Sequence, residues 1–137
     1  MARPNPKDSA TILIVENEGL VRRELVYGFR EMGLRVLEAQ DADEAIALLN
    51  EHPEVRLMVT DIRMSGSMDG VRLAHHVRKR WPPVKIIVAS GWPETQPRDL
   101  PARSVLIAKP YEQETLWLAA AELLGGRVEV STGPCAA

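Results

Sequence analysis

Short apolar segments rich in β-branched residues recur along this chain, and segments of helical period alternate with them. The strand-like segments cover residues 11–15, 34–39, 56–60, 84–89 and 104–108. Apolar residues recur every three or four positions over residues 19–32, 41–50, 70–81 and 111–124. A strand without polar alternation is buried on both faces, so this order predicts a parallel sheet with helices on both sides.

The connection between the last two predicted strands departs from this pattern. Residues 91–103 contain Pro93, Pro97 and Pro101 and few apolar side chains. An interior proline costs a helix about 3 kcal/mol, because it removes a hydrogen bond and clashes with the preceding turn. We therefore expect the fourth helix of the fold to be short or degenerate.

The composition indicates one domain of a cytoplasmic protein. The chain has 137 residues, which suits a domain over residues 11–124 between flexible tails at 1–10 and 125–137. A net charge of −2, from 17 basic and 19 acidic residues, argues against direct DNA binding. No apolar run reaches the roughly 18 residues of a membrane span, and the polar N-terminus does not fit a signal peptide. The single cysteine, Cys135, excludes an internal disulfide.

Polar residues stand at the carboxyl ends of the predicted strands, which meet at one edge of a parallel sheet. Glu16 follows the first strand, Asp61 the third, Ser90 the fourth and Lys109 the fifth. These groups suit phosphoryl transfer to a carboxylate, because a divalent ion and fixed donors must neutralise the phosphoryl oxygens. Mg²⁺ prefers such oxygen ligands. Asp61 is ionised at neutral pH and needs no strong base to act as the nucleophile.

The chain resembles the receiver domains of two-component response regulators over residues 10–124. The resemblance lies in segments 12–18, 59–64, 68–70, 89–91 and 109–111, which read ILIVENE, VTDIRM, MDG, ASG and KPY. It implies a flavodoxin-like, doubly wound, five-stranded parallel sheet of order 2-1-3-4-5. The insertion at Ser65–Met68 and the proline-rich connection resemble a subclass common in alphaproteobacteria, which stands alone or is fused to sensor kinases.

The resemblance also implies a role for each residue at the sheet edge. Asp61 would accept the phosphoryl group, Ser90 would donate its hydroxyl to a phosphoryl oxygen, and Lys109 would pair with Asp61 or with the phosphoryl group. Glu16 and Asp61 would hold Mg²⁺, together with the backbone carbonyl of Arg63. The phosphoryl donor would be a sensor histidine kinase or a histidine phosphotransfer protein, and the output a downstream protein target, with homodimer formation left open.

Two positions depart from the family pattern. Asn17 stands where the family usually has a second metal-binding carboxylate. Its amide oxygen would still bind Mg²⁺, but one negative charge is lost, so we expect weaker binding; a loop cap is the structural alternative for this residue. Leu106 replaces the aromatic residue that rotates in many receivers. Any switching would then involve the connection 91–103, with Trp92 or Tyr111 moving.

Three functions remain open at this point. The first is a phosphoacceptor switch that is not an enzyme beyond weak autodephosphorylation. The second is a pseudo-receiver, which binds proteins without phosphate, and Asn17 and Leu106 favour it. The third is a Mg²⁺-dependent phosphohydrolase, and Arg63 argues against it because such enzymes carry an acid/base aspartate at that position. We interpret the adjacent His75 and His76 as exposed surface residues.

Overall fold

The computed structural model describes residues 10–63, 68–91, 96–109 and 112–125. Strands and helices alternate along this part of the chain, and a single 3₁₀ turn stands between the last two strands. The elements are β1 (Thr11–Val15), α1 (Gly19–Glu31), β2 (Arg35–Ala39), α2 (Ala42–Glu51), β3 (Val55–Asp61), α3 (Gly70–Arg80), β4 (Lys85–Ser90), η1 (Pro97–Asp99), β5 (Ser104–Ala108) and α4 (Gln113–Leu123).

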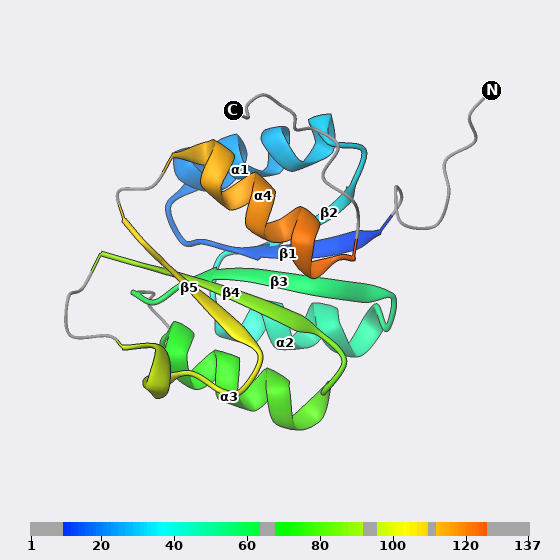
Figure 1. The fold of residues 1–137 in the computed structure, drawn as a ribbon. Coiled ribbons are helices and arrows are strands. Elements are labelled where there is room, and N and C mark those ends of the chain that lie inside the picture. The colour runs from blue at the N-terminus through cyan, green and yellow to red at the C-terminus, as the bar shows by residue number, and fades with distance from the viewer. Residues whose placement is uncertain (1–9, 64–67, 92–95, 110–111, 126–137) are drawn as a thin grey trace.

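The five strands form one parallel sheet of order β2-β1-β3-β4-β5. Helices α1 and α4 cover one face of this sheet, and α2 and α3 cover the other (Figure 1). The predicted doubly wound architecture and strand order are therefore confirmed. Because β1 and β3 lie at the centre, their carboxyl ends are flanked by neighbouring strands on both sides.

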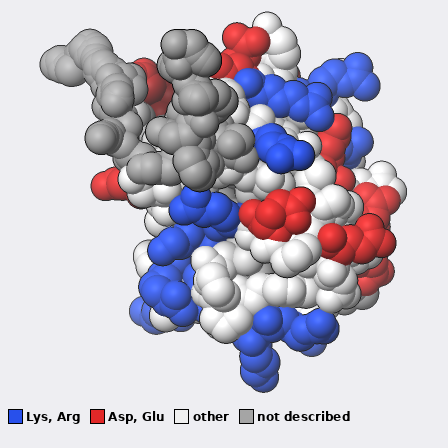
Figure 2. Space-filling model, turned by 90° about the vertical axis from the view of Figure 1, so that its right-hand side faces the viewer, with Lys and Arg blue, Asp and Glu red and all other residues white. Residues whose placement is uncertain are grey.

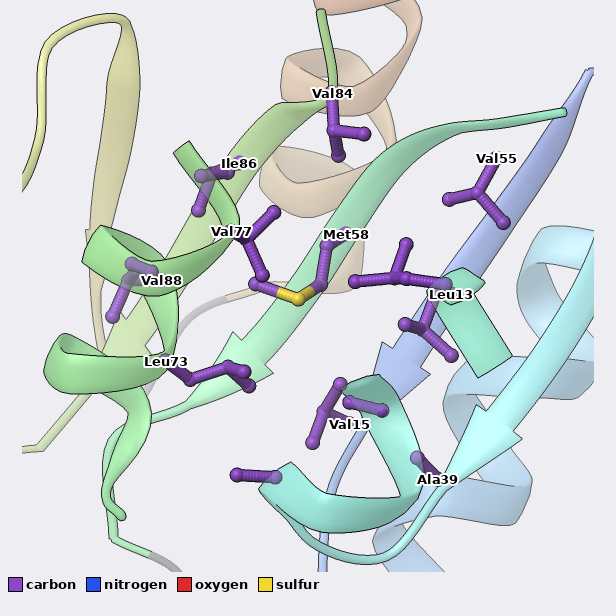
Figure 3. Packing of buried hydrophobic residues seen from close by; sticks show 14 of the residues in the cluster. Leu13, Val15, Ala39, Val55, Met58, Leu73, Val77, Val84, Ile86 and Val88 are labelled. Atoms are coloured by element: carbon purple, nitrogen blue, oxygen red, sulfur yellow. The ribbon is translucent and has the colours of Figure 1, made fainter. Parts of the chain in front are cut away.

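Two apolar clusters hold the helices to the sheet, one on each face. Leu13 and Met58 point to the side of α2 and α3, where they pack with Leu73 (Figure 3). The neighbouring Ile12 belongs to the cluster under α1 and α4, which also contains Phe29. Successive residues of a strand point to opposite faces. The unbroken apolar segments of the sequence thus supply both clusters.

The residues predicted to cap α1 and α2 are confirmed. Asp41, one of two candidate caps, accepts a hydrogen bond on Oδ1 from the Glu44 N–H at 2.9 Å. Asp69 caps α3 in the same way, with the Arg72 N–H at 3.0 Å. Gly33 follows α1 at φ 87°, a conformation that glycine adopts without steric cost.

The proline-rich connection contains one 3₁₀ turn, Pro97–Asp99, as expected of a degenerate helix. Residues 92–95 lie outside the described part of the chain, as do residues 1–9 and 126–137 of the predicted tails. The boundaries of β1 and β5 agree with the prediction, and those of the other elements differ from it by at most two residues. No helix of the described residues is long and apolar enough to cross a membrane.

One expectation about the surface is wrong in part. His75 is exposed, but His76 is half-buried and its ring lies edge-on to Trp81, with 6.1 Å between ring centroids. The His76 Nε2 atom is buried, and none of the described residues gives it a hydrogen-bond partner. Adjacent helical residues differ in direction by about 100°, so one of the pair can face the core while the other faces solvent.

Charge is divided unevenly along the chain. Residues 10–63 carry six basic and eleven acidic side chains, whereas the described residues from 68 to 109 carry eight basic and two acidic ones. Figure 2 shows basic side chains along the lower part of one face and acidic ones to its right. This face is therefore not uniformly basic, as a DNA-binding surface would be. The absence of direct DNA binding stays a prediction.

Candidate functional site

Four polar residues from four strands meet at the carboxyl edge of the sheet. Asp61 ends β3 and lies in register with Ala89 of β4, so Ser90 follows directly beside it. Ser90 in turn lies in register with Ala108 of β5, and Lys109 comes next in the chain. Parallel pairing thus brings these residues together although nearly fifty positions separate Asp61 from Lys109.

Asp61 forms an ion pair across the edge. The Lys109 ammonium lies 3.1 Å from the Asp61 carboxylate oxygen Oδ1, and the two side chains are 32% and 13% exposed. The same oxygen accepts a hydrogen bond from the Ile62 N–H at 2.8 Å. The Asp61 carboxylate is therefore largely shielded, oriented and next to a cation.

Glu16 is the buried carboxylate of the site. It is 5% exposed, and its Oε2 atom accepts a hydrogen bond from the Glu18 N–H at 3.1 Å. Burial raises the pKa of Glu16, and the nearby charge of Asp61 raises it further; together they outweigh the opposing effects of the Glu18 N–H and Lys109. The pocket thus holds more negative charge than its own cation balances.

Arg22 fixes the loop that carries Glu16. Its guanidinium donates to the backbone carbonyl of Glu16 at 2.8 Å and to Oε1 of Glu38, on β2, at 3.2 Å. The sequence prediction missed this residue, because Arg22 and Arg23 are adjacent and alike in local pattern. Only the rotation of α1 against β2 distinguishes them.

Gly70 allows α3 to begin directly against Asp61. Its N–H donates to the Ile62 carbonyl at 2.8 Å. A Cβ atom at this position would lie 2.8 Å from the Ile62 Cα and would overlap the Asp61 carbonyl oxygen. Real Cβ atoms do not approach backbone so closely, so the glycine is required by this contact.

The remaining predicted residues differ in burial. Ser90 is 4% exposed, whereas Asn17 and Arg63 are exposed at the rim. Leu106 is half-buried and packs on the cluster under α2 and α3. Trp92 and Tyr111, expected to move in switching, and residues 65–67 of the predicted insertion lie outside the described residues.

The donor set fits a hard divalent cation that keeps several waters. The candidate protein ligands are oxygens: the carboxylates of Glu16 and Asp61, the Asn17 amide and the Arg63 carbonyl. Among the described residues, no group of three or more His, Cys, Asp or Glu could hold a metal ion. The amide at position 17 therefore leaves a two-carboxylate pocket, as the sequence indicates.

Comparisons with known proteins agree with this geometry. The family model of the response regulator receiver domain matches residues 12–120. The sensor kinase CckA of Brucella abortus is 36% identical over 120 residues, which are 85% of this chain and 13% of that kinase. The hydrogenase transcriptional regulatory protein HoxA of Cupriavidus necator is 40% identical over 91 residues, 64% of this chain and 17% of the regulator.

Solved structures show the same fold. The receiver domain of the hybrid histidine kinase CckA superposes with a TM-score of 0.72 at 28% identity, covering 83% of this chain and 98% of that domain. A response regulator receiver protein from Sinorhizobium medicae has a TM-score of 0.79 at 24% identity, covering 85% and 95%. The chain belongs to the family of response regulator receiver domains.

Proposed function

We propose that this receiver domain accepts a phosphoryl group on Asp61 and signals through the resulting change of its surface. The observation that carries the proposal is the Asp61–Lys109 pair, 3.1 Å apart at the carboxyl edge of the sheet. An Asp61 oxygen attacks phosphorus, the bond from phosphorus to the donor's leaving atom breaks, and an acyl phosphate forms. With a phosphohistidine donor, the displaced imidazole nitrogen keeps the electron pair of the broken bond.

The neighbouring side chains have distinct parts in this reaction. Lys109 would move its ammonium from Asp61 to a phosphoryl oxygen, and the buried Ser90 hydroxyl would donate to another. Bound Mg²⁺ would neutralise the remaining oxygen charge, held by the oxygens of Glu16, Asn17, Asp61 and Arg63. Burial and the nearby charge of Asp61 raise the pKa of Glu16, which supports this assignment, because a bound cation would offset both the lost hydration and the repulsion between the two carboxylates.

The phosphoryl donor we propose is a sensor histidine kinase or a histidine phosphotransfer protein. The likeness to the receiver domain of CckA supports a kinase-linked relay. Hydrolysis of the acyl phosphate would be a slow side reaction rather than an enzymatic function. Arg63 stands two residues after the acceptor and offers no general acid or base to speed that step.

The test is phosphorylation of the purified chain by acetyl phosphate, read by intact mass. We expect one added phosphoryl group that requires both Mg²⁺ and Asp61. Asp61→Asn should abolish the gain, whereas Asp43→Asn on the exposed surface of α2 should leave it unchanged. Asn17→Asp should lower the Mg²⁺ concentration needed, because it adds a third carboxylate at the rim.

A pseudo-receiver is the second candidate function, and the exposed amide at Asn17 favours it. In that case the fold would present a protein-binding surface without accepting phosphate. The acetyl phosphate experiment separates the two functions. A folded chain that gains no mass at high Mg²⁺, even with Asn17→Asp in place, would support the pseudo-receiver and contradict phosphorylation.

A further inference from the structure

Four basic side chains gather around the C-terminal end of α3, at the edge of the sheet where the strands begin. Arg78, Lys79 and Arg80 form the last turn of this helix. Arg103 joins them from the turn before β5, because the Pro82 carbonyl accepts hydrogen bonds from Nη1 of Arg78 at 2.7 Å and from Nη1 of Arg103 at 3.4 Å. Successive helix residues point about 100° apart. The four residues, here called the cationic band, therefore run from the β5 turn around the end of the helix.

Arg78 fixes the geometry of the cationic band. Its guanidinium also donates to the carbonyls of Ala102 at 3.0 Å, Val84 at 2.6 Å and Arg103 at 3.2 Å. These bonds tie the end of α3 to the turns before β4 and β5, so Arg103 is held beside the helix. Burial and the neighbouring charge of Arg103 lower the pKa of Arg78. Two like charges are thus kept close together by the backbone around them.

No carboxylate of the described residues balances the cationic band. The ion pairs formed in this part of the chain include none of its four side chains. The described acidic residues between 68 and 109 are Asp69, which caps the opposite end of α3, and Asp99, which caps η1. The basic side chains in the lower part of Figure 2 stand apart from the acidic ones at its right. The band is therefore a positive surface without counter-charge in the described structure.

Arg103 is unfavourable for the fold in two respects. Its φ is 64°, a left-handed conformation that no other non-glycine residue of the described chain adopts. Glycine takes this conformation without the steric cost that a Cβ atom brings. The Arg103 charge also repels that of Arg78. The helix dipole favours cations in the last turn of α3, but Arg103 lies outside that helix. An exposed, strained arginine next to a like charge is better explained by a ligand than by stability.

The other end of the cationic band is held in place next to apolar surface. The Arg80 guanidinium lies 4.8 Å from the centroid of the Trp81 ring and donates to Oδ1 of Asn50, on α2, at 3.0 Å. Trp81 is half-buried, and Pro82 and Pro83 beside it are exposed. A charged side chain that is already ordered loses less entropy when it binds a ligand.

We propose that the cationic band binds a short acidic segment of a partner protein. Carboxylates of the segment would lie opposite Lys79, Arg80 and Arg103, and its apolar atoms against Trp81. The band crosses one helix, which is about 10–12 Å wide with its side chains. An extended segment of about four residues spans that width, at roughly 3.3 Å per residue. A long polyanion suits the band less, because acidic side chains stand on the same face (Figure 2).

The test is titration of the ¹⁵N-labelled full chain with a hexaglutamate peptide, read from amide chemical shifts at about 20 mM salt, where exposed charges are weakly screened. We expect shifts confined to residues 78–85 and 102–104. Binding should weaken about tenfold by about 200 mM salt, because the cations are exposed. Hexaglutamine, of the same length without charge, should cause no shift.

Charge reversals locate the contact. Arg103→Glu and Lys79→Glu should each raise the Kd for hexaglutamate at least about tenfold. Arg72→Glu is the matched control, because it makes the same change of charge at an exposed position in the first turn of the same helix. It should bind the peptide as the original chain does.

Arg103→Gly separates binding from stability. It should weaken peptide binding as Arg103→Glu does without lowering the midpoint of thermal unfolding, because glycine adopts the left-handed conformation and removes the repulsion of Arg78. A lower midpoint would show that the arginine serves the fold, and would overturn the proposal.

Three further outcomes would also overturn it. The peptide leaves the amides of the cationic band unshifted, or Arg72→Glu weakens binding as much as Arg103→Glu, which would reduce the effect to net charge. The third is tighter binding of single-stranded DNA or of anionic lipid vesicles than of the peptide at these residues. The band lies at the opposite end of α3 from Asp61, so Asp61→Asn should bind the peptide unchanged. Failure here would leave the proposed phosphorylation untouched.

Discussion

The acidic side of the site, formed by Glu16 and Asp61, and its cationic side, formed by Lys109 beside Ser90, are held in place by different contacts. On the acidic side, α1 starts three residues after Glu16, Arg22 of that helix clamps the loop, and Gly70 places α3 against the Asp61 backbone. On the cationic side, the described part of the connection from Ser90 to β5 contains only the 3₁₀ turn η1.

Few contacts tie η1 itself to the rest of the molecule. The residues after it are held better, because Leu100 is buried and Arg78 of α3 donates to the carbonyls of Ala102 and Arg103. His75 Nε2 on α3 lies 2.8 Å from the Asp99 carbonyl oxygen, and both residues are exposed. Local stability follows the number of buried contacts and protected hydrogen bonds in a segment. The comparison indicates that the carboxylates are held rigidly, whereas η1 has more freedom to rearrange.

The largest effect is expected at Gly70. Gly70→Ala should lower the free energy of unfolding by about 3 kcal/mol, because the added Cβ must displace the backbone of Asp61 or Ile62. Urea denaturation measures the change. Gly19→Ala is the control, since a Cβ there meets no atom closer than 4.0 Å. Equal stability of the two variants would contradict a tightly held acidic side.

Arg22→Ala should have the next largest effect. We expect a loss of about 1–2 kcal/mol in unfolding free energy, since both the bond to the Glu16 carbonyl and the pair with Glu38 disappear. If Asp61 is phosphorylated, the Mg²⁺ needed for half-maximal uptake should rise about tenfold. Glu38→Gln keeps the bond from Arg22 to the Glu16 carbonyl, so it should change the unfolding free energy and the Mg²⁺ requirement less than Arg22→Ala does. A larger effect of Glu38→Gln would mean that the pair with Glu38, rather than the bond to Glu16, holds the loop.

Glu16→Gln should stabilise the metal-free fold at neutral pH while weakening Mg²⁺ binding. The pKa of Glu16 is raised in the folded state, so the cost of ionising it is absent below its ordinary pKa and complete above the raised one. The gain from Glu16→Gln should therefore vanish at acidic pH. Thermal unfolding with chelator, from acidic to neutral pH, measures this, and a gain independent of pH would refute a charge effect.

The smallest effect is expected on the cationic side. His75→Ala should cost less than about 1 kcal/mol, because it removes one exposed hydrogen bond. Amide hydrogen exchange over residues 96–100 should become faster, while that of the Glu16 loop stays unchanged. His52→Ala, which removes an exposed pair with Glu54, is the control. Faster exchange at Glu16 as well would mean that the two sides are coupled.

Apolar periodicity was sufficient to predict the sheet, the order of its elements along the chain and the residues at its carboxyl edge. Unbroken apolar segments alternating with helical period permit few other folds, and parallel pairing then carries every strand end to the same edge. Glu16, Asp61, Ser90 and Lys109 could therefore be grouped before any coordinates. Their chemical roles rest on the family resemblance and stay predictions.

The packing of the helices was needed to distinguish which of two similar neighbouring residues contacts the site or the core. Arg22 rather than Arg23 clamps the Glu16 loop, and His76 rather than His75 turns toward the core. The same holds for Gly70, whose contact with Asp61 depends on where α3 begins. Such choices depend on the rotation and approach of packed helices, which neighbouring residues in a sequence do not encode.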